Sequence, residues 1–135
     1  MILVDSNILI DLATRDPVWG AWSRDAFALA AESDLVAINP IIYAEASIGY
    51  DTAADFDSVL DDVGITRLAL PYPAGYIAGQ AFGKYRKRGG ARPTPLPDFY
   101  IGAHALVDGM ALLTRDRRHF GAYFPTVRLI APEAG

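Results

Sequence analysis

The sequence Ile2-Leu3-Val4-Asp5-Ser6-Asn7 opens the chain and decides its fold class. Three consecutive large apolar residues are typical of a short strand that is buried on both faces of a sheet. Asp5 ends this run, and Ser6 or Asn7 can cap a helix that continues through Leu12. A strand that passes directly into a helix favours a parallel sheet, because parallel strands need a crossover connection between them.

Strands and helices alternate along the rest of the chain. Apolar runs predict strands at residues 35–38, 65–70, 111–113 and 127–130. Helical spacing of apolar residues predicts helices that begin near residues 17, 40, 53, 73 and 98. The segment 89–97 holds three prolines and is expected to be a loop. This order predicts an α/β fold, namely a three-layer α/β/α sandwich with a central, mainly parallel sheet.

Composition narrows the class of protein further. The length of 135 residues predicts one domain over residues 1–135, and a hydrophobic content of 52% excludes intrinsic disorder as the default. The sequence has no cysteine, which excludes disulfides, thiolate zinc sites and cysteine nucleophiles. Asp5 interrupts the first apolar run, and no apolar run reaches the length of a membrane span. We therefore expect a cytoplasmic protein that has no membrane partner.

Four acidic residues stand at positions that suit a ligand site. Asp5 ends the first strand, and Asp116 follows the fourth strand in Thr114-Arg115-Asp116. Glu45 lies among apolar residues of a helix, and Asp98 begins another helix. In parallel sheets, ligands bind beyond the carboxyl ends of the strands. Each acid also has an ordinary explanation, since Asp98 and Asp116 can be helix N-caps and Glu45 can lie on the polar edge of its helix.

Convergence of these acids would have a chemical consequence. Carboxylates that share one crevice repel one another, and a divalent cation relieves that repulsion. Mg²⁺ takes oxygen ligands and keeps several waters, which suits a site that acts on a phosphodiester. A bound ion can lower the pKa of a water molecule and neutralise charge on the phosphate.

Other chemistries fit the residues less well. His104 lies on an apolar helix and is expected to be a core residue, whereas His119 follows two arginines and is expected to face solvent or a phosphate. The sequence has no HExxH zinc motif, no GxSxG elbow and no GxxxxGK[ST] loop. A phosphatase of the haloacid dehalogenase type needs a second Asp where this chain has Asn7. A receiver-like signalling domain needs an Asp near Leu70-Pro71, and none is present there.

The basic residues are concentrated in two segments, although the net charge of the chain is -4. Eight of the 12 basic residues lie in these segments. They are Lys84, Arg86, Lys87, Arg88 and Arg92 in one segment, and Arg115, Arg117 and Arg118 in the other. A charge run of this kind is either a solvated face or a contact surface for a nucleic-acid backbone. Both segments lie close in sequence to a candidate acid, so we expect them to follow a nucleic-acid backbone on either side of the acidic site.

Four segments resemble, in order, the acidic motifs of PIN domains. They are Asp5-Ser6-Asn7-Ile8-Leu9-Ile10-Asp11, Ile38-Asn39-Pro40-Ile41-Ile42-Tyr43-Ala44-Glu45, Leu96-Pro97-Asp98-Phe99-Tyr100-Ile101-Gly102-Ala103-His104-Ala105, and Leu112-Leu113-Thr114-Arg115-Asp116 with Phe120. Together with the length, they resemble the VapC-like toxins of type II toxin–antitoxin modules. The resemblance spans Met1 to about Leu129.

The resemblance implies an α/β/α sandwich with Mg²⁺- or Mn²⁺-dependent endoribonuclease activity, a homodimer, and a small antitoxin that blocks the site. It implies that Asp5, Glu45, Asp98 and Asp116 form the acidic, metal-holding site, and that Asn7 and Thr114 orient ligands or water. The alternative is a PIN-like domain that binds RNA or protein without catalysis. Trp19 and Trp22 are expected either to pack in the core or to meet the antitoxin or a second subunit.

Overall fold

Five parallel strands form the sheet in the computed structural model, which describes residues 1–89 and 96–133. The strands are β1 (Ile2–Val4), β2 (Val36–Ile38), β3 (Thr66–Arg67), β4 (Ala111–Leu113) and β5 (Leu129–Ile130). They lie in the order β3-β2-β1-β4-β5, so β1 is central and pairs with both β2 and β4. Ile2 aligns with Val36 on one side and with Ala111 on the other. The predicted parallel α/β sheet is confirmed.

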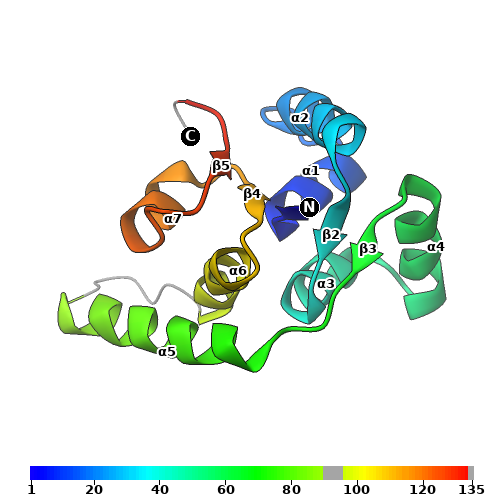
Figure 1. Ribbon diagram of the computed structural model, residues 1–135. Coiled ribbons are helices and arrows are strands. Elements are labelled where there is room, and N and C mark those ends of the chain that lie inside the picture. Colours follow the sequence, from blue (N-terminus) through cyan, green and yellow to red (C-terminus); the bar gives the residue numbers. More distant parts are fainter. Residues whose placement is uncertain (90–95, 134–135) are drawn as a thin grey trace.

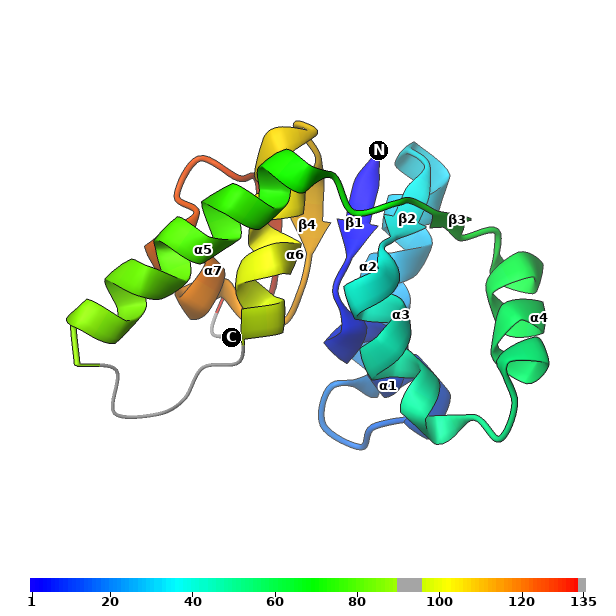
Figure 2. The ribbon, with the colours of Figure 1, turned by 90° about the horizontal axis from the view of Figure 1, so that it is seen from below.

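Helices cover both faces of this sheet (Figures 1 and 2). They are α1 (Ser6–Thr14), α2 (Gly20–Ser33), α3 (Pro40–Ala46), α4 (Ala53–Val63), α5 (Tyr72–Lys87), α6 (Leu96–Val107) and α7 (Arg117–Tyr123), with a 3-10 turn, η1 (Ser47–Gly49), after α3. In Figure 1, α2 lies on one side of the sheet and α6 lies on the other, with α5 packed outside α6. The chain therefore has the expected three layers.

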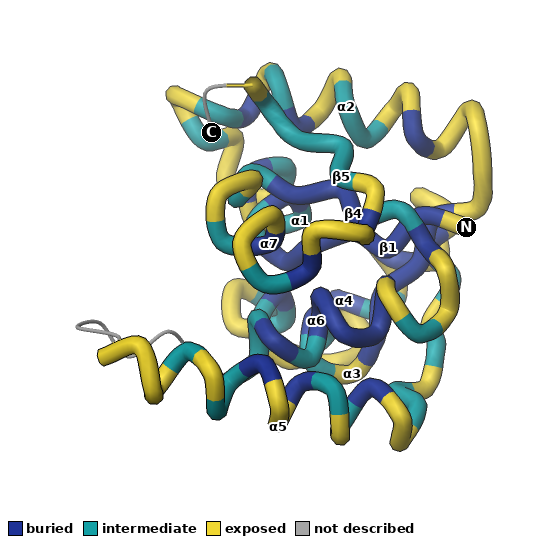
Figure 3. Tube along the Cα trace, turned by 60° about the vertical axis from the view of Figure 1, so that its left-hand side comes forward, coloured by how far each residue is buried: buried dark blue, intermediate teal, exposed yellow. Residues whose placement is uncertain are grey.

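The core lies where the central strands meet α6. Leu3, Val4, Leu112 and Leu113 have no exposed surface, and Phe99 of α6 is buried with them. Figure 3 shows the buried stretches gathered on the strands and α6, whereas α5 alternates between buried and exposed residues along its length. The small residues Ala74, Ala78 and Ala81 form the buried side of α5, so α5 can approach α6 closely.

Several predicted boundaries were wrong by a few residues. The second helix begins at Gly20 rather than at Pro17, because Asp16 accepts hydrogen bonds from the backbone of Val18 and Trp19 and holds a turn there. The second strand excludes the exposed Leu35. The third and fifth strands are two residues each, shorter than predicted.

The start of α6 also differs from the prediction. Residues 90–95 of the predicted loop lie outside the described residues, but Leu96 and Pro97 are already helical. Proline fits the first turn of a helix, where its missing N–H has no partner to lose. Asp98 is therefore a residue of the first turn and not the N-cap.

His104 of α6 is a satisfied core residue, as the sequence predicts. It has no exposed surface, and its Nδ1 lies 3.0 Å from Asn39 Nδ2. Asn39 Oδ1 accepts from Ile42 N, so its amide nitrogen faces the ring and His104 is neutral, with Nε2 donating to Asp108. Burial lowers the pKa of His104, which favours the same neutral form. None of the helices in the described ranges is long and apolar enough to cross a membrane.

Gly102 is needed for close packing between α6 and Phe124. A Cβ at position 102 would lie 2.3 Å from Phe124 Cδ2 and 2.4 Å from Cε2, far inside contact distance. Phe124 is itself buried, so its ring has little room to move. Gly79 of α5 is a matched case without this constraint, because nothing lies within 4 Å of a Cβ there.

We expect Gly102→Ala to destabilise the protein by about 1–3 kcal/mol through overpacking. Gly79→Ala should instead stabilise it by roughly 0.5–1 kcal/mol, since alanine is the better helix former. Urea unfolding of both variants measures the difference. Equal effects of the two substitutions would show that α6 can move away from Phe124 without cost.

Candidate active site

Asp5 joins β1 to α1 and is almost fully buried at the carboxyl end of the sheet. Its backbone N–H donates to Leu113 of β4, and its side chain caps α1. Oδ1 accepts from Ser6 N at 2.7 Å, and Oδ2 accepts from Thr114 Oγ1 at 2.7 Å. The carboxylate is thus fixed by both neighbouring segments. The sequence suggested Ser6 or Asn7 as the cap, which was wrong, because Asp5 performs this role.

Ser6 connects Asp5 to Glu45. Its hydroxyl lies 2.9 Å from Glu45 Oε1 and 3.4 Å from Asp5 Oδ1. Glu45 lies near the end of α3 and is half-buried, so α1 and α3 meet at this hydroxyl. The sequence predicts Ser6 only as a capping residue, so this contact is not among the predictions. Its position directly after the strand-end acid was the available signal.

Asn7, Thr114 and Asp116 form the next part of the cluster. Asn7 Nδ2 lies 3.4 Å from Thr114 Oγ1, and Asn7 Oδ1 accepts from Arg115 N at 3.4 Å. Thr114 Oγ1 also accepts from Asp116 N at 3.0 Å. Asp116 Oδ1 accepts from His119 N, so Asp116 is the N-cap of α7, as its ordinary explanation predicts. The capping bond uses one oxygen, and Asp116 still lies beside the other acids.

Asp98, at the start of α6, is the fourth acid of this cluster. Burial raises its pKa to about 7, and repulsion from Asp5, Glu45 and Asp116 adds to this shift. Burial also raises the pKa of Asp5 to about 6, with a smaller contribution from Glu45. Figure 2 shows the edge where this occurs, since β1 and β4 point toward the beginnings of α1 and α6. Four acids from four separate segments therefore share one electrostatic environment.

The acids are close, but they do not form a ready-made coordination shell. Within residues 1–89 and 96–133, no three His, Asp or Glu side chains are arranged tightly enough to hold a metal ion. Each oxygen of Asp5 accepts a short hydrogen bond and keeps a second lone pair. The donor set still fits a hard divalent cation, since it consists of carboxylate and hydroxyl oxygens with unrelieved mutual repulsion.

Comparison with known proteins agrees with this architecture. The family model described as "PIN domain" matches residues 2–124. The chain belongs to the PIN-domain family. Among curated proteins, no significant match to the sequence is found.

Solved structures share the fold of this PIN domain at low sequence identity. VapBC2 from Rickettsia felis, bound to a DNA fragment from its promoter, has a TM-score of 0.72 at 19% identity and covers 97% of this chain and 98% of its own. A toxin–antitoxin complex from Klebsiella pneumoniae has a TM-score of 0.70 at 21% identity, with coverage of 94% and 95%. DNA-bound VapBC from Salmonella typhimurium has a TM-score of 0.69 at 21% identity, with 96% of each chain covered.

The basic residues of the PIN domain fall into different environments. Lys84, Arg86, Lys87 and Arg88 are exposed at the end of α5, where Arg86 and Arg88 lie over the rings of Phe82 and Tyr123. Arg118 is exposed on α7, and Arg92 lies outside the described residues. Arg115 is paired with Asp11, and Arg117 donates to the carbonyls of Ala131 and Pro132. Of the seven candidate RNA contacts that the structure describes, two, Arg115 and Arg117, are thus held by an ion pair or hydrogen bonds within the protein.

His119 and the two tryptophans are half-buried. The His119 ring packs against Phe99, Phe120 and Tyr123, so the expectation that it faces solvent was wrong. Trp19 and Trp22 meet edge to face with ring centroids 6.4 Å apart. Trp22 packs against the core, which agrees with its packing explanation.

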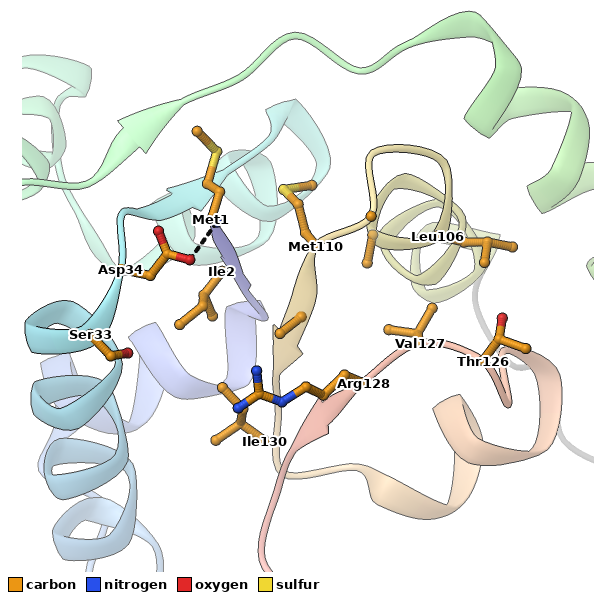
Figure 4. Close-up of a pocket in the computed structure, with 13 residues that line it drawn as sticks. Met1, Ile2, Ser33, Asp34, Leu106, Met110, Thr126, Val127, Arg128 and Ile130 are labelled. Atoms are coloured by element: carbon orange, nitrogen blue, oxygen red, sulfur yellow. Dashed lines mark hydrogen bonds and ion pairs between the residues drawn. The ribbon is translucent and has the colours of Figure 1, made fainter.

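A cavity of about 450 Å³ opens at the opposite, amino edge of the sheet. Figure 4 shows Asp34, Met110 and Arg128 around it, with the Met1 ammonium paired to Asp34 at 2.6 Å. None of the four clustered acids lines this cavity. The acid cluster and the cavity are therefore separate features.

The carboxyl of Asp98 should lower the stability of the metal-free PIN domain as the pH rises from 5.5 to 8. Because the pKa of Asp98 is about 7 in the folded state, against an ordinary 3.8, this residue binds more protons in the folded protein than in the unfolded chain in this range. The stability from the protonated carboxyl is complete below about pH 4 and is lost as the pH passes through 7. Asp98→Asn should therefore raise the Tm in EDTA more at pH 8 than at pH 5.5.

The comparison with Asp98→Asn also removes the contribution of the histidines. Burial lowers the pKa values of His104 and His119, so they act in the opposite direction, but they do so in both proteins. The same Tm difference between the variant and wild type at both pH values would contradict the raised pKa of Asp98.

Proposed function

We propose that this PIN domain is a metal-dependent endoribonuclease that hydrolyses RNA phosphodiester bonds and acts as the toxin of a type II toxin–antitoxin pair. The observation that carries the proposal is the convergence of Asp5, Glu45, Asp98 and Asp116 at the carboxyl edge of the sheet. Such a cluster is costly to the fold, since like charges repel in a partly desolvated site. A bound divalent cation would relieve this repulsion, so a metal site accounts for the presence of the four acids.

Asp5, Glu45, Asp98 and Asp116 would hold Mg²⁺ or Mn²⁺. When bound, the ion would activate a water molecule and neutralise charge on the scissile phosphate. The protein's own groups prepare the site before it binds. Thr114 and Ser6 fix the two oxygens of Asp5, and Asn7 orients Thr114. These hydrogen bonds favour the ionised form of the carboxylate, against the effect of burial, and hold it in one rotamer, which is the usual task of groups around metal ligands.

Exposed cations at the end of α5 and on α7 would attract the RNA. The exposed residues Lys84, Arg86, Lys87, Arg88 and Arg118 would follow the RNA backbone, whereas Arg115 and Arg117 already have partners in the protein. Arg92, which lies outside the described residues, would belong to the same surface. Phosphate contacts give affinity and orientation but little sequence information. The sequence that is cleaved therefore depends on other contacts.

An antitoxin would cover an apolar groove beside the acids. Two adjoining hollows of about 150 and 390 Å³ share Ala13, Ala46 and Tyr50 and lie between α1, α3, η1 and α4. Glu45 lines the second hollow, and Ile48 at its rim is 84% exposed. Exposed apolar surface of this kind marks an interaction site. A partner bound there would reach the acid cluster and block it. A homodimer and a cytoplasmic location also belong to this proposal.

Replacing a clustered acid should abolish cleavage. Asp98→Asn keeps the shape of the side chain and removes one metal-holding charge, so Mg²⁺- or Mn²⁺-dependent cleavage of cellular RNA should fall by about a hundredfold or more. Asp62→Asn on the exposed side of α4 is the matched control and should cleave at the wild-type rate. The rates are measured with and without EDTA, after circular dichroism has confirmed folding.

Two outcomes would contradict the enzyme assignment. Cleavage that persists in EDTA would remove the metal ion from the mechanism. Wild-type protein that binds RNA without cleaving it in either metal would instead indicate a non-catalytic PIN-like binding domain.

Ile48→Asp should weaken the complex with the antitoxin by about tenfold or more, because it places a charge in the apolar groove. Its Tm should stay near the wild-type value, since Ile48 is exposed. Leu29→Asp, at an exposed position of α2, should not change binding.

Trp22→Ala should mainly lower the Tm. Calorimetric titration of the antitoxin into each variant provides the test, and strong loss of binding in Trp22→Ala alone would move the interface to α2.

A further inference from the structure

We propose that Arg115 is a positioning residue, which clamps the segment carrying Thr114 and Asp116 to α1 through its ion pair with Asp11, and that it does not contact RNA. The sequence suggested the opposite, because Arg115 belongs to a basic run beside a candidate acid. The catalytic consequence rests on the function proposed above, whereas the clamp itself does not.

Asp11 is the fixed half of this clamp. It is 1% exposed, on the second turn of α1. Arg115 Nη2 donates to Asp11 Oδ1 at 3.0 Å, and Arg115 Nε lies 2.7 Å from Asp11 Oδ2. Ser23 Oγ of α2 donates to Oδ2 at 2.7 Å. A buried carboxylate needs a counter-charge and hydrogen bonds, and Arg115 is the cation that supplies the charge.

The guanidinium group of Arg115 also packs over an aromatic ring. It lies over the Trp19 ring at 5.5 Å, within the range of a cation–π contact. The side chain of Arg115 is 29% exposed. An RNA phosphate would have to compete with Asp11 for the same guanidinium N–H groups, so Arg115 is poorly placed to bind RNA.

The clamp acts on the acid cluster because Asn7 lies one turn before Asp11 on α1. Asn7 bonds Thr114 Oγ1 and the backbone N–H of Arg115. Thr114 in turn donates to Asp5 and accepts from the backbone N–H of Asp116. Segment 114–116 is therefore attached to the start of α1 by the bond of Thr114 to the N-cap Asp5, and to the body of α1 by Asn7 and by the ion pair of Arg115 with Asp11. The Asn7 contacts are long, at 3.4 Å, so the ion pair with Asp11 holds Arg115 and Asp116 to α1 more strongly than Asn7 does.

Arg115→Lys is the sharpest test, because it keeps the charge that Asp11 needs and removes the fork and the flat face. In metal-free protein, amide hydrogen exchange at positions 115 and 116 should become about tenfold faster or more, while the amides of β1 and β4 keep their protection. With RNA and Mg²⁺, kcat should fall by about tenfold or more and KM should stay unchanged. Arg128→Lys at the amino edge is the matched control and should change none of these values.

The double variant Asp11→Asn/Arg115→Gln separates positioning from RNA contact. It removes both charges together, so no unpaired charge is left buried. The salt dependence of RNA affinity should match that of wild type. A slope lowered by about 0.7 would show a phosphate contact at Arg115 and overturn the proposal. Wild-type amide exchange and kcat in Arg115→Lys would overturn it as well. If wild-type protein fails to cleave RNA, the proposed function is lost, but amide exchange still decides the clamp.

Discussion

A carboxylate that is nearly excluded from water must find hydrogen bonds within the protein, and Asp5 meets this requirement by joining three parts of the chain. Its oxygens accept from Ser6 at the start of α1 and from Thr114 at the end of β4, while its backbone continues the ladder to Leu113. The same residue ends a strand, caps a helix and fixes the neighbouring strand end. The carboxyl edge of the sheet is organised around this one buried charge.

The other acids make this edge unfavourable in the absence of a cation. Asp98 lies in the first turn of α6, where the helix dipole favours a negative charge, and yet its pKa is raised to about 7. Burial and repulsion from three carboxylates therefore outweigh the helix terminus. The fold tolerates this because α6 is anchored elsewhere, through Phe99 in the core and through the His104 contact with Asn39. Stability from the core supports strain at the site, a common arrangement at functional positions.

The sequence was most informative where structure and chemistry follow from neighbouring residues. Ile2-Leu3-Val4 followed by Asp5 predicts a buried strand with an acid at its end, and both features depend on adjacent positions. The convergence of Glu45 and Asp98 on Asp5 followed only from the family resemblance, because periodicity does not say which ends of two helices meet. The start of α6 was mislocated because Pro97 is equally compatible with a loop and with a first helical turn.

Arg115 shows why charge patterns mislead when they are considered alone. A cluster of cations in sequence says nothing about a carboxylate 104 residues away, and Asp11 looks like an ordinary polar residue of an amphipathic helix. Once the parallel sheet brings the end of β4 beside α1, Asp11 is buried and requires a cation. Arg115, the residue that follows Thr114, reaches Asp11 with its guanidinium group. Arg115 is therefore constrained by the fold before any nucleic acid is considered, and the same topology that assembles the acids determines which basic residues remain free.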